Sequence, residues 1–181
     1  MKKSILFVLV SVFVIAMFSA CADDSPASPG ASCGIVIGDK LNNENGDWSE
    51  DYLVALDQVI ASDTTVYKLG IKLGADSNYI LAIYNNNAGQ PGSVIAQTAA
   101  RSGTTGWNEA DLTSPVSLTA GSTYWLVAIT DTVSITSNED SGIVKYYSYL
   151  YSDAASLGMP GGLTGWNDNS GRIKVYATSC R

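Results

Sequence analysis

The chain has 181 residues, a formal net charge of −7 and no histidine, and hydrophobic residues make up 46% of it. Its ten basic residues form no cluster, which argues against nucleic acid as a partner and against charge-driven binding to anionic lipid. Without histidine, Ser-His and Cys-His nucleophile pairs are absent and a zinc site is disfavoured. No Walker loop or dinucleotide fingerprint occurs either. We therefore predict that the protein is not an enzyme.

The N-terminus has the pattern of an export signal. Two lysines precede an apolar run over residues 5–18, which is shorter than the roughly 20 residues that span a bilayer. We predict a secretory signal peptide over residues 1–20. The following "FSAC" resembles the lipobox of bacterial lipoproteins, with Phe18 where leucine is commoner. This resemblance implies cleavage before Cys21 and lipidation of Cys21. An ordinary signal peptide with an incidental cysteine is the alternative.

The segment after the cysteine is rich in Asp, Ser, Pro, Ala and Gly, and it lacks large apolar residues. Such a composition cannot bury enough surface to fold. We therefore predict that residues 21–32 are a lipidated cysteine with a flexible tether and that residues 33–181 form one domain. Ala22 follows the lipobox, and by analogy with enteric lipoproteins this disfavours retention in the inner membrane. The expected location is the cell envelope, at the outer membrane or the cell surface, with the membrane contacted through the lipid.

Two more cysteines bracket the predicted domain. Cys33 opens it and Cys180 nearly ends it. In an exported chain this pair suggests a disulfide. Closing a loop of about 150 residues would stabilise the fold by roughly 5 kcal/mol in the chain-entropy model. Two free thiols or a metal-binding pair are the alternatives.

Short apolar segments rich in Val, Ile, Tyr and Thr recur between turn signals, and no long helical pattern is present. This spacing predicts an all-β fold, a β-sandwich of about eight or nine mostly antiparallel strands. The stretch "ADLTSPVSLTAGSTYWLVAITD" predicts a hairpin with "TAGS" as its turn. The predicted strand segments are 33–38, 51–61, 65–74, 79–86, 93–100, 115–119, 122–130, 143–151 and 172–180.

Several of these stretches together resemble a known kind of module. "LAIYNNNAGQPGSVIAQT", "GWNEADLTSPVSLTAGSTYWLVAITD" and "GRIKVYAT" are similar to the jelly-roll, carbohydrate-binding-module-like domains of secreted bacterial and archaeal multidomain proteins. The resemblance covers roughly residues 35–178. It implies a jelly-roll-like sandwich and says little about activity, because its motifs are turns and strands and are not chemical groups.

Carboxylates are the only acid–base groups that a hydrolase could use in this chain. Glu109 and Asp111 would share one face of a strand, and Glu139 and Asp140 lie in a predicted loop. A glycosidase needs two carboxylates about 5–10 Å apart across the scissile bond. The alternative is that these carboxylates are simply solvated on an acidic surface.

One oxygen-rich stretch raises the question of a structural calcium ion. An EF-hand alignment on Gly46 fails, because its first and twelfth positions fall on Leu41 and Tyr52. A looser site remains open, and the alternative is an Asn/Asp/Gly turn held by side-chain hydrogen bonds. No other cofactor is expected. The candidate ligands are Asp39, Asn43, Asn45 and Asp47.

Four tyrosines lie within "GIVKYYSYLYSD". On a regular strand, one face would carry Lys145 with Tyr147, Tyr149 and Tyr151, and this face would point to solvent. Exposed phenols suit the apolar faces and hydroxyls of sugars, so these three are ligand-binding candidates. There are two alternatives: these tyrosines only cover the sheet, as polar-tipped tyrosines often do in secreted sandwiches, or the strand bulges and buries them. The opposite face, predicted as core, carries Val144, Tyr146, Ser148 and Leu150.

The four tryptophans divide into two groups. Trp125 lies in the most apolar segment and is predicted to be core. Trp48, Trp107 and Trp166 lie in turn-rich segments, as loop anchors or ligand stackers, and Trp48 and Trp166 join the ligand-binding candidates. The sequence thus favours a lipid-anchored, non-enzymatic binding or adhesion module with polysaccharide as the leading ligand. The alternative is a structural or protein-interaction subunit that uses the tyrosine face or an edge strand.

Overall fold

The computed structural model describes residues 34–38, 40 and 45–180, with the backbone alone at 139–141. The chain divides into two units, residues 1–30 and 31–181, and the first lies outside the described part. The predicted signal peptide, lipidated Cys21 and tether lie outside it as well. In the described residues, no helix combines the length and the apolar character needed to cross a bilayer.

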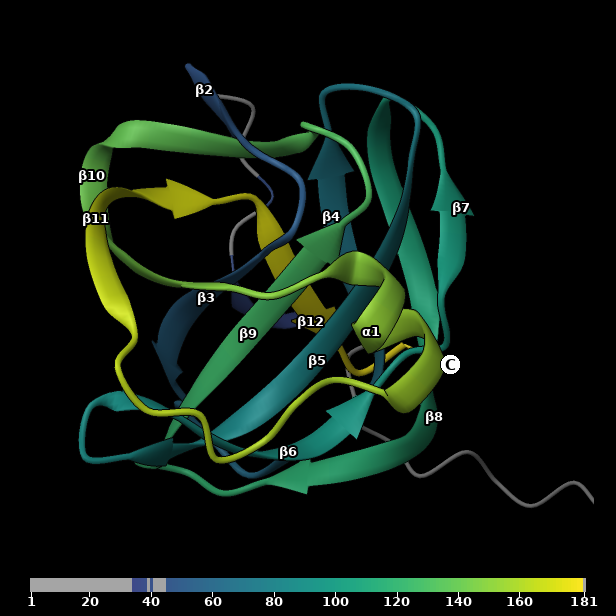
Figure 1. The fold of residues 1–181 in the computed structure, drawn as a ribbon. Helices are drawn as coiled ribbons and strands as arrows, with labels where there is room; N and C mark the ends of the chain where they lie inside the picture. The colour runs from purple at the N-terminus through teal and green to yellow at the C-terminus, as the bar shows by residue number, and fades with distance from the viewer. Residues whose placement is uncertain (1–33, 39, 41–44, 181) are drawn as a thin grey trace, which may run out of the picture. The chain divides into compact units, whose positions relative to one another are not determined.

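The described residues form an all-β fold with one short helix, and every strand pair is antiparallel (Figure 1). One sheet has the strand order β1-β12-β4-β10-β3-β9-β5-β6, and β2, β7, β8 and β11 pair beside this path. The elements are β1 (Ile35–Gly38), β2 (Gly46–Trp48), β3 (Tyr52–Val59), β4 (Thr64–Leu73), β5 (Ser77–Asn87), β6 (Gln90–Gln97), β7 (Arg101–Gly103), β8 (Gly106–Leu118), β9 (Thr123–Thr130), β10 (Ile135–Ser148), α1 (Tyr151–Leu157), β11 (Asn167–Ile173) and β12 (Val175–Thr178).

The all-β prediction is confirmed, and each of the nine predicted segments contains all or part of a strand. The predicted count of eight or nine is not confirmed, since the described residues form twelve strands. The three additional ones are β2, β7 and β11. β2 and β7 have three residues each, too few to give an alternating pattern.

The predicted hairpin over "ADLTSPVSLTAGSTYWLVAITD" is wrong. Its turn forms, because Ser122 N donates to Thr119 O at 3.2 Å. The flanking strands then separate: β8 pairs with β4, while β9 pairs with β3 and β5. β9 is buried along most of its length and needs a strand on each side. A local hairpin would leave one of its edges unpaired.

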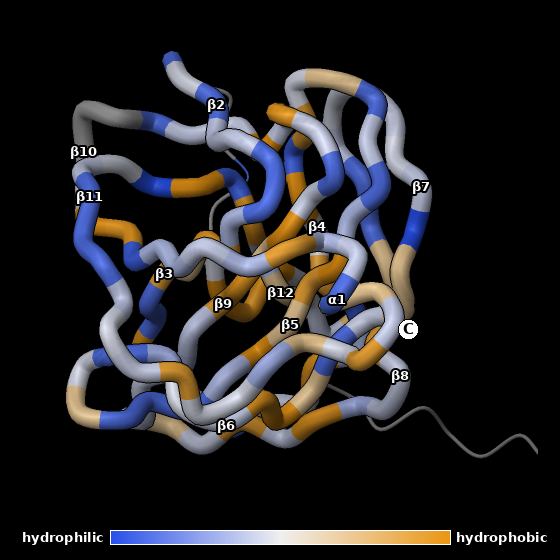
Figure 2. The backbone as a smooth tube through the Cα atoms, in the orientation of Figure 1, coloured by the Kyte–Doolittle hydropathy of each residue, from blue (hydrophilic) through white to orange (hydrophobic). Residues whose placement is uncertain are grey.

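Both faces of the central strands β3, β9 and β5 are buried, in two hydrophobic clusters. The first cluster joins side chains such as Val54, Leu81 and Leu126 to side chains of β4, β8 and β12. The second, on the other face, contains Leu53 and Trp125. This double burial explains why each central strand contains a run of consecutive apolar residues, as the orange segments of β9 and β5 illustrate (Figure 2). The prediction that Trp125 is core is confirmed.

The tyrosine stretch is not one regular strand over 143–151. β10 ends at Ser148, and α1 begins at Tyr151. Asp51 determines this change of direction: its backbone oxygen accepts from Tyr149 N at 3.0 Å, and its carboxylate accepts from Tyr151 N at 2.7 Å. Because the alternation ends there, Ser148 and Leu150 are exposed and the prediction that they are core is wrong.

Candidate functional site

The predicted tyrosine face covers part of the sheet. Tyr147, Tyr149 and Tyr151 are half-buried and pack against the second hydrophobic cluster. The ring of Tyr147 lies 5.8 Å from that of Trp166, measured between centroids. Burial raises the pKa of Tyr84, a member of the cluster, and nearby Tyr149 adds to the shift. These contacts favour the burial alternative over a free strip of phenols.

Trp166 also belongs to this cluster. Its side chain is only 6% exposed, so it offers little ring surface for stacking on a ligand. It packs in the second cluster as a loop anchor, one of the two roles that the sequence left open. Around it, the segment after β10 passes over the central strands (Figure 1). Tyr84 fastens this segment, because its hydroxyl donates to Pro160 O at 2.7 Å.

Trp48, the remaining candidate, lies elsewhere, in a small cleft where three half-buried aromatic rings meet. Tyr146 is the central ring: its centroid lies 5.5 Å from that of Trp48 and 5.8 Å from that of Tyr52. Both pairs are inclined, the geometry that aromatic side chains prefer. The cleft has a volume of about 250 Å³. We call it the aromatic cleft, and its lining residues are Asp47, Trp48, Ser49, Tyr52, Tyr146, Asn169 and Ser170.

β10 assembles this cleft from segments that are distant in the sequence. Its first part pairs with β2, with Ile135 opposite Trp48. Its last part pairs with β3, and Ser148 lies opposite Tyr52. β11 pairs alongside, and the register of β10 with β11 shifts between Asn138 and Ile143. One long, irregular strand therefore brings β2, β11 and the start of β3 together.

The polar groups of the aromatic cleft are accessible to a ligand. The side chains of Asp47, Ser49, Asn169 and Ser170 are exposed beside the three rings. Together they offer a carboxylate, an amide and two hydroxyls as hydrogen-bonding groups. Apolar ring faces next to a few convergent polar groups are the usual composition of a small-molecule site.

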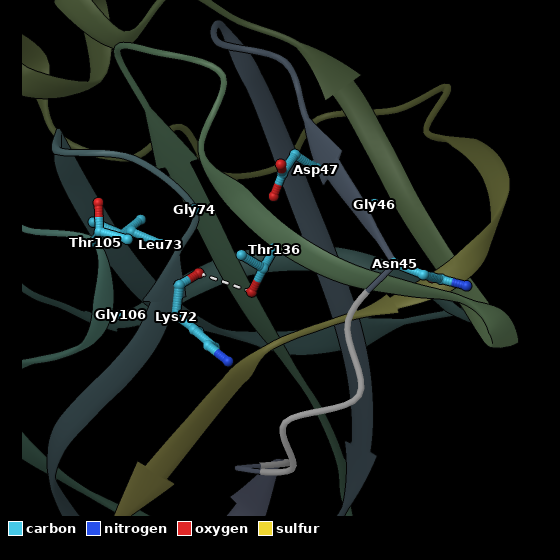
Figure 3. A pocket seen from close by; sticks show the side chains of 9 residues that line it. All are labelled: Asn45, Gly46, Asp47, Lys72, Leu73, Gly74, Thr105, Gly106 and Thr136. Carbon is cyan, nitrogen blue, oxygen red and sulfur yellow. Dashed lines mark hydrogen bonds between the residues drawn. The ribbon is translucent and has the colours of Figure 1, made fainter.

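A second cleft of about 440 Å³ shares Asp47 with the first. We call it the polar cleft; among its lining residues only Leu73 has a large apolar side chain, and none is aromatic (Figure 3). Thr136 Oγ1 donates to Lys72 O at 3.1 Å, which holds one wall. The lining residues are Asn45, Gly46, Asp47, Lys72, Leu73, Gly74, Thr105, Gly106 and Thr136.

A third hollow, of about 330 Å³, is lined mainly by residues of β3, β5, β9, β10 and β11. Trp125 lines this hollow but is only 4% exposed, and its Nε1 donates to Asn86 Oδ1 at 3.0 Å. Lys145 and Asp168 form an ion pair at its side. With its indole covered and these polar groups already paired, this hollow is the weaker ligand site.

Two of the four carboxylates considered for hydrolysis, Glu109 and Asp111, are paired with lysines. Glu109 accepts from Tyr176 Oη and lies 3.9 Å from Lys40 Nζ. Asp111 lies 3.7 Å from Lys68 Nζ. Burial and the bond to Glu109 raise the pKa of Tyr176. Glu139 and Asp140 lie in β10, so the prediction that they are in a loop is wrong, and their side chains lie outside the described part. The structure thus describes contacts for two of the four carboxylates, and each of these two forms an ion pair with a lysine.

The structure describes only two of the four candidate calcium ligands. Asp39 and Asn43 lie outside the described residues, whereas Asn45 and Asp47 flank the polar cleft. The side chain of Asn45 points away from Asp47 (Figure 3). In the described part of the chain, no three His, Cys, Asp or Glu side chains are grouped as metal ligands. Calcium binding stays a prediction.

No family model and no curated protein matches the chain. The resemblance to jelly-roll domains and to lipoproteins therefore stays a prediction. Of the five ligand-binding candidates, the aromatic cleft includes Trp48 alone. Sequence reasoning missed Tyr52 and Tyr146, which become neighbours of Trp48 only through the pairings of β10.

Proposed function

We propose that the protein is a lipid-anchored, non-enzymatic module outside the cytoplasm, of jelly-roll-like sandwich architecture, that binds polysaccharide in the aromatic cleft. The sandwich is supported by the first hydrophobic cluster, in which side chains of β3, β9 and β5 pack against those of β4, β8 and β12. The lipid anchor depends on the sequence around Cys21, which lies outside the described residues.

The observation that carries the binding proposal is the composition of the aromatic cleft. Trp48, Tyr52 and Tyr146 present half-buried rings, and exposed Asn169 and Ser170 lie beside them. A pyranose ring has apolar C–H faces that pack on aromatic rings, and hydroxyls around its edge that pair with amides and hydroxyls. The cleft offers both kinds of contact within one small volume.

A disulfide between Cys33 and Cys180 is part of this proposal. Cys33 lies outside the described residues, but the residues beside the two cysteines are adjacent. Ser179 N donates to Gly34 O at 3.1 Å, and Gly34 N donates to Ser179 Oγ at 3.4 Å. The antiparallel pairing of β1 with β12 continues into this contact, which supports a bond joining the two ends of the domain.

The test is a glycan array probed with the full chain, alongside Trp48→Ala and Trp107→Ala. Trp107 is the matched control because it is also half-buried and its ring centroid lies 5.3 Å from that of Tyr176, outside the aromatic cleft. We expect binding to at least one polysaccharide, a tenfold or greater loss for Trp48→Ala, and no comparable loss for Trp107→Ala. Equal binding by the wild type and Trp48→Ala would contradict the proposal, as would an array without signal.

Protein interaction is the second candidate function. The observation that favours it is the position of β1 and β6 at the two ends of the strand path. Ile35 on β1 and Ile95 on β6 are exposed apolar side chains. An end strand can accept another strand, which is a common route to association. Self-association that is lost on an Ile95→Lys substitution, together with a blank glycan array, would favour this alternative.

A further inference from the structure

Asp47 lies at the junction of two clefts. It lines the aromatic cleft together with Trp48, and it lines the polar cleft together with Gly74 and Thr136. The aromatic cleft, at about 250 Å³, is smaller than the usual ligand site of roughly 300–1,000 Å³. A ligand seated on the three rings would therefore extend past Asp47 into the polar cleft.

The carboxylate of Asp47 is available to such a ligand. Within the described part of the chain, it makes no hydrogen bond or ion pair, and the side chain is exposed. Figure 3 shows it directed toward the side where Gly74 and Thr136 lie, while the ammonium group of Lys72 points away from it. An ionised carboxylate accepts hydrogen bonds through both oxygens, which suits a pair of neighbouring sugar hydroxyls.

The carboxylate of Asp47 lies close to Gly74, in space that a Cβ atom at residue 74 would restrict. A Cβ added at Gly74 would lie 2.8 Å from Asp47 Oδ1 and 3.3 Å from its Cγ. The carboxylate would have to move, and it could do so easily because it is the free end of an exposed side chain. Gly74→Ala is therefore a substitution that displaces the carboxylate while keeping its charge.

The polar cleft could bind a second sugar through hydrogen bonds, because its lining residues are mostly polar and none is aromatic. Thr105 donates its hydroxyl to Asp76 at 3.2 Å, and Thr136 donates its own to Lys72 O at 3.1 Å. Each threonine oxygen keeps a lone pair that can accept from a sugar hydroxyl. An acidic sugar would face the negative charge of Asp47 on a chain of net charge −7.

We propose that the two clefts form one surface on which Asp47 joins adjacent sugar subsites, and that the ligand is an uncharged oligosaccharide of two or more rings. This inference depends on the proposed function, because it extends the same site. One ring packs on Trp48 and Tyr146, the hydroxyls between the rings donate to Asp47, and the next ring lies against Thr105 and Thr136.

The experiment is isothermal titration calorimetry of the full chain. The uncharged probes are cello-, xylo-, manno- and malto-oligosaccharides of one, two and four rings, and the acidic probe is tetragalacturonate. The variants are Asp47→Asn and Gly74→Ala. Gly161→Ala is the matched control, because the nearest atom to its added Cβ lies at an ordinary 3.4 Å and Gly161 lines neither cleft.

We expect at least one uncharged series to bind, with affinity rising tenfold or more between one ring and four. Asp47→Asn and Gly74→Ala should each weaken four-ring binding at least tenfold, and Gly161→Ala should not. Asp47→Asn should also improve binding of tetragalacturonate. Sugar binding without a gain in length, or unaffected by both cleft variants, would overturn this inference and leave the proposed function intact. Failure of all four series to bind would overturn this inference, and a glycan array without signal would overturn the proposed function as well.

Discussion

Replacing Tyr147 by alanine measures how firmly the segment after β10 is held on the central strands. The ring of Tyr147 is half-buried against the second hydrophobic cluster and lies 5.8 Å from that of Trp166. A fully buried aromatic side chain removes about 150–250 Å² from water, so half-burial corresponds to roughly 100 Å². At about 25 cal/mol per Å², this area contributes roughly 2.5 kcal/mol. The inclined ring pair adds about 0.5–1.5 kcal/mol.

We therefore expect Tyr147→Ala to lower the free energy of unfolding by about 3 kcal/mol, measured by denaturant titration. The control is Leu157→Ala on α1, in the same segment, whose side chain is 80% exposed. An exposed substitution of this kind changes stability by no more than about 0.5 kcal/mol. If the two variants lose equal stability, Tyr147 does not hold this segment and the burial argument fails. The tyrosine face would then return as a candidate ligand surface.

Three further predictions concern stability and anchoring. Burial alone would raise the pKa of Asp131, but hydrogen bonds from Asn78 and Ser77 lower this pKa overall. The carboxylate therefore stabilises the fold at pH values above its unfolded pKa. This stabilisation is lost as the pH falls through the folded pKa. Unfolding of Asp131→Asn should accordingly show a deficit at pH 7 that shrinks below about pH 4, and a pH-independent deficit would refute it. Cys21→Ser should move the protein from the membrane pellet to the soluble fraction, and retention in the pellet at high salt would argue against the lipid anchor. Intact-mass measurement of the denatured, non-reduced, alkylated protein should find Cys33 and Cys180 unmodified, whereas two alkylated thiols would refute the disulfide.

The strand segments were predictable because their signals are local. Each of the nine predicted segments contains all or part of a strand, since β-branched and aromatic runs between Gly, Asn and Pro turns mark strands in any all-β fold. Which strands pair was not predictable in the same way. The turn at Thr119–Ser122 formed as predicted, yet β8 and β9 find partners elsewhere, because the buried β9 needs two neighbours.

The three unpredicted strands have weak signals for a physical reason. β11 has the sequence "NDNSGRI", which is typical of a turn, and it becomes a strand because β10 supplies its partner. β2 has only three residues and likewise exists through pairing with β10. Strands that depend on tertiary partners in this way leave no alternating pattern to detect.

The aromatic cleft could be predicted only in part. The sequence indicates Trp48 as a candidate because it lies in a turn-rich segment, where a tryptophan is a loop anchor or a ligand stacker. Strand alternation predicts Tyr146 as a core residue, and Val144 on the same face is indeed fully buried. At Tyr146 that face reaches the edge of the packed region, so the ring stays half-buried beside Tyr52. Whether Tyr146 is buried or half-buried depends on where β3 begins and β2 ends, and the alternation of apolar and polar residues does not encode these positions.

The most direct test of polysaccharide binding in the aromatic cleft is a crystal structure of the full chain with the oligosaccharide that the glycan array ranks highest. We predict a sugar ring packed against Trp48 or Tyr146, with its hydroxyls within hydrogen-bonding distance of Asn169 or Asp47. A sugar bound in the hollow over Trp125, or on Tyr149 and Tyr151 with the aromatic cleft empty, would contradict the account.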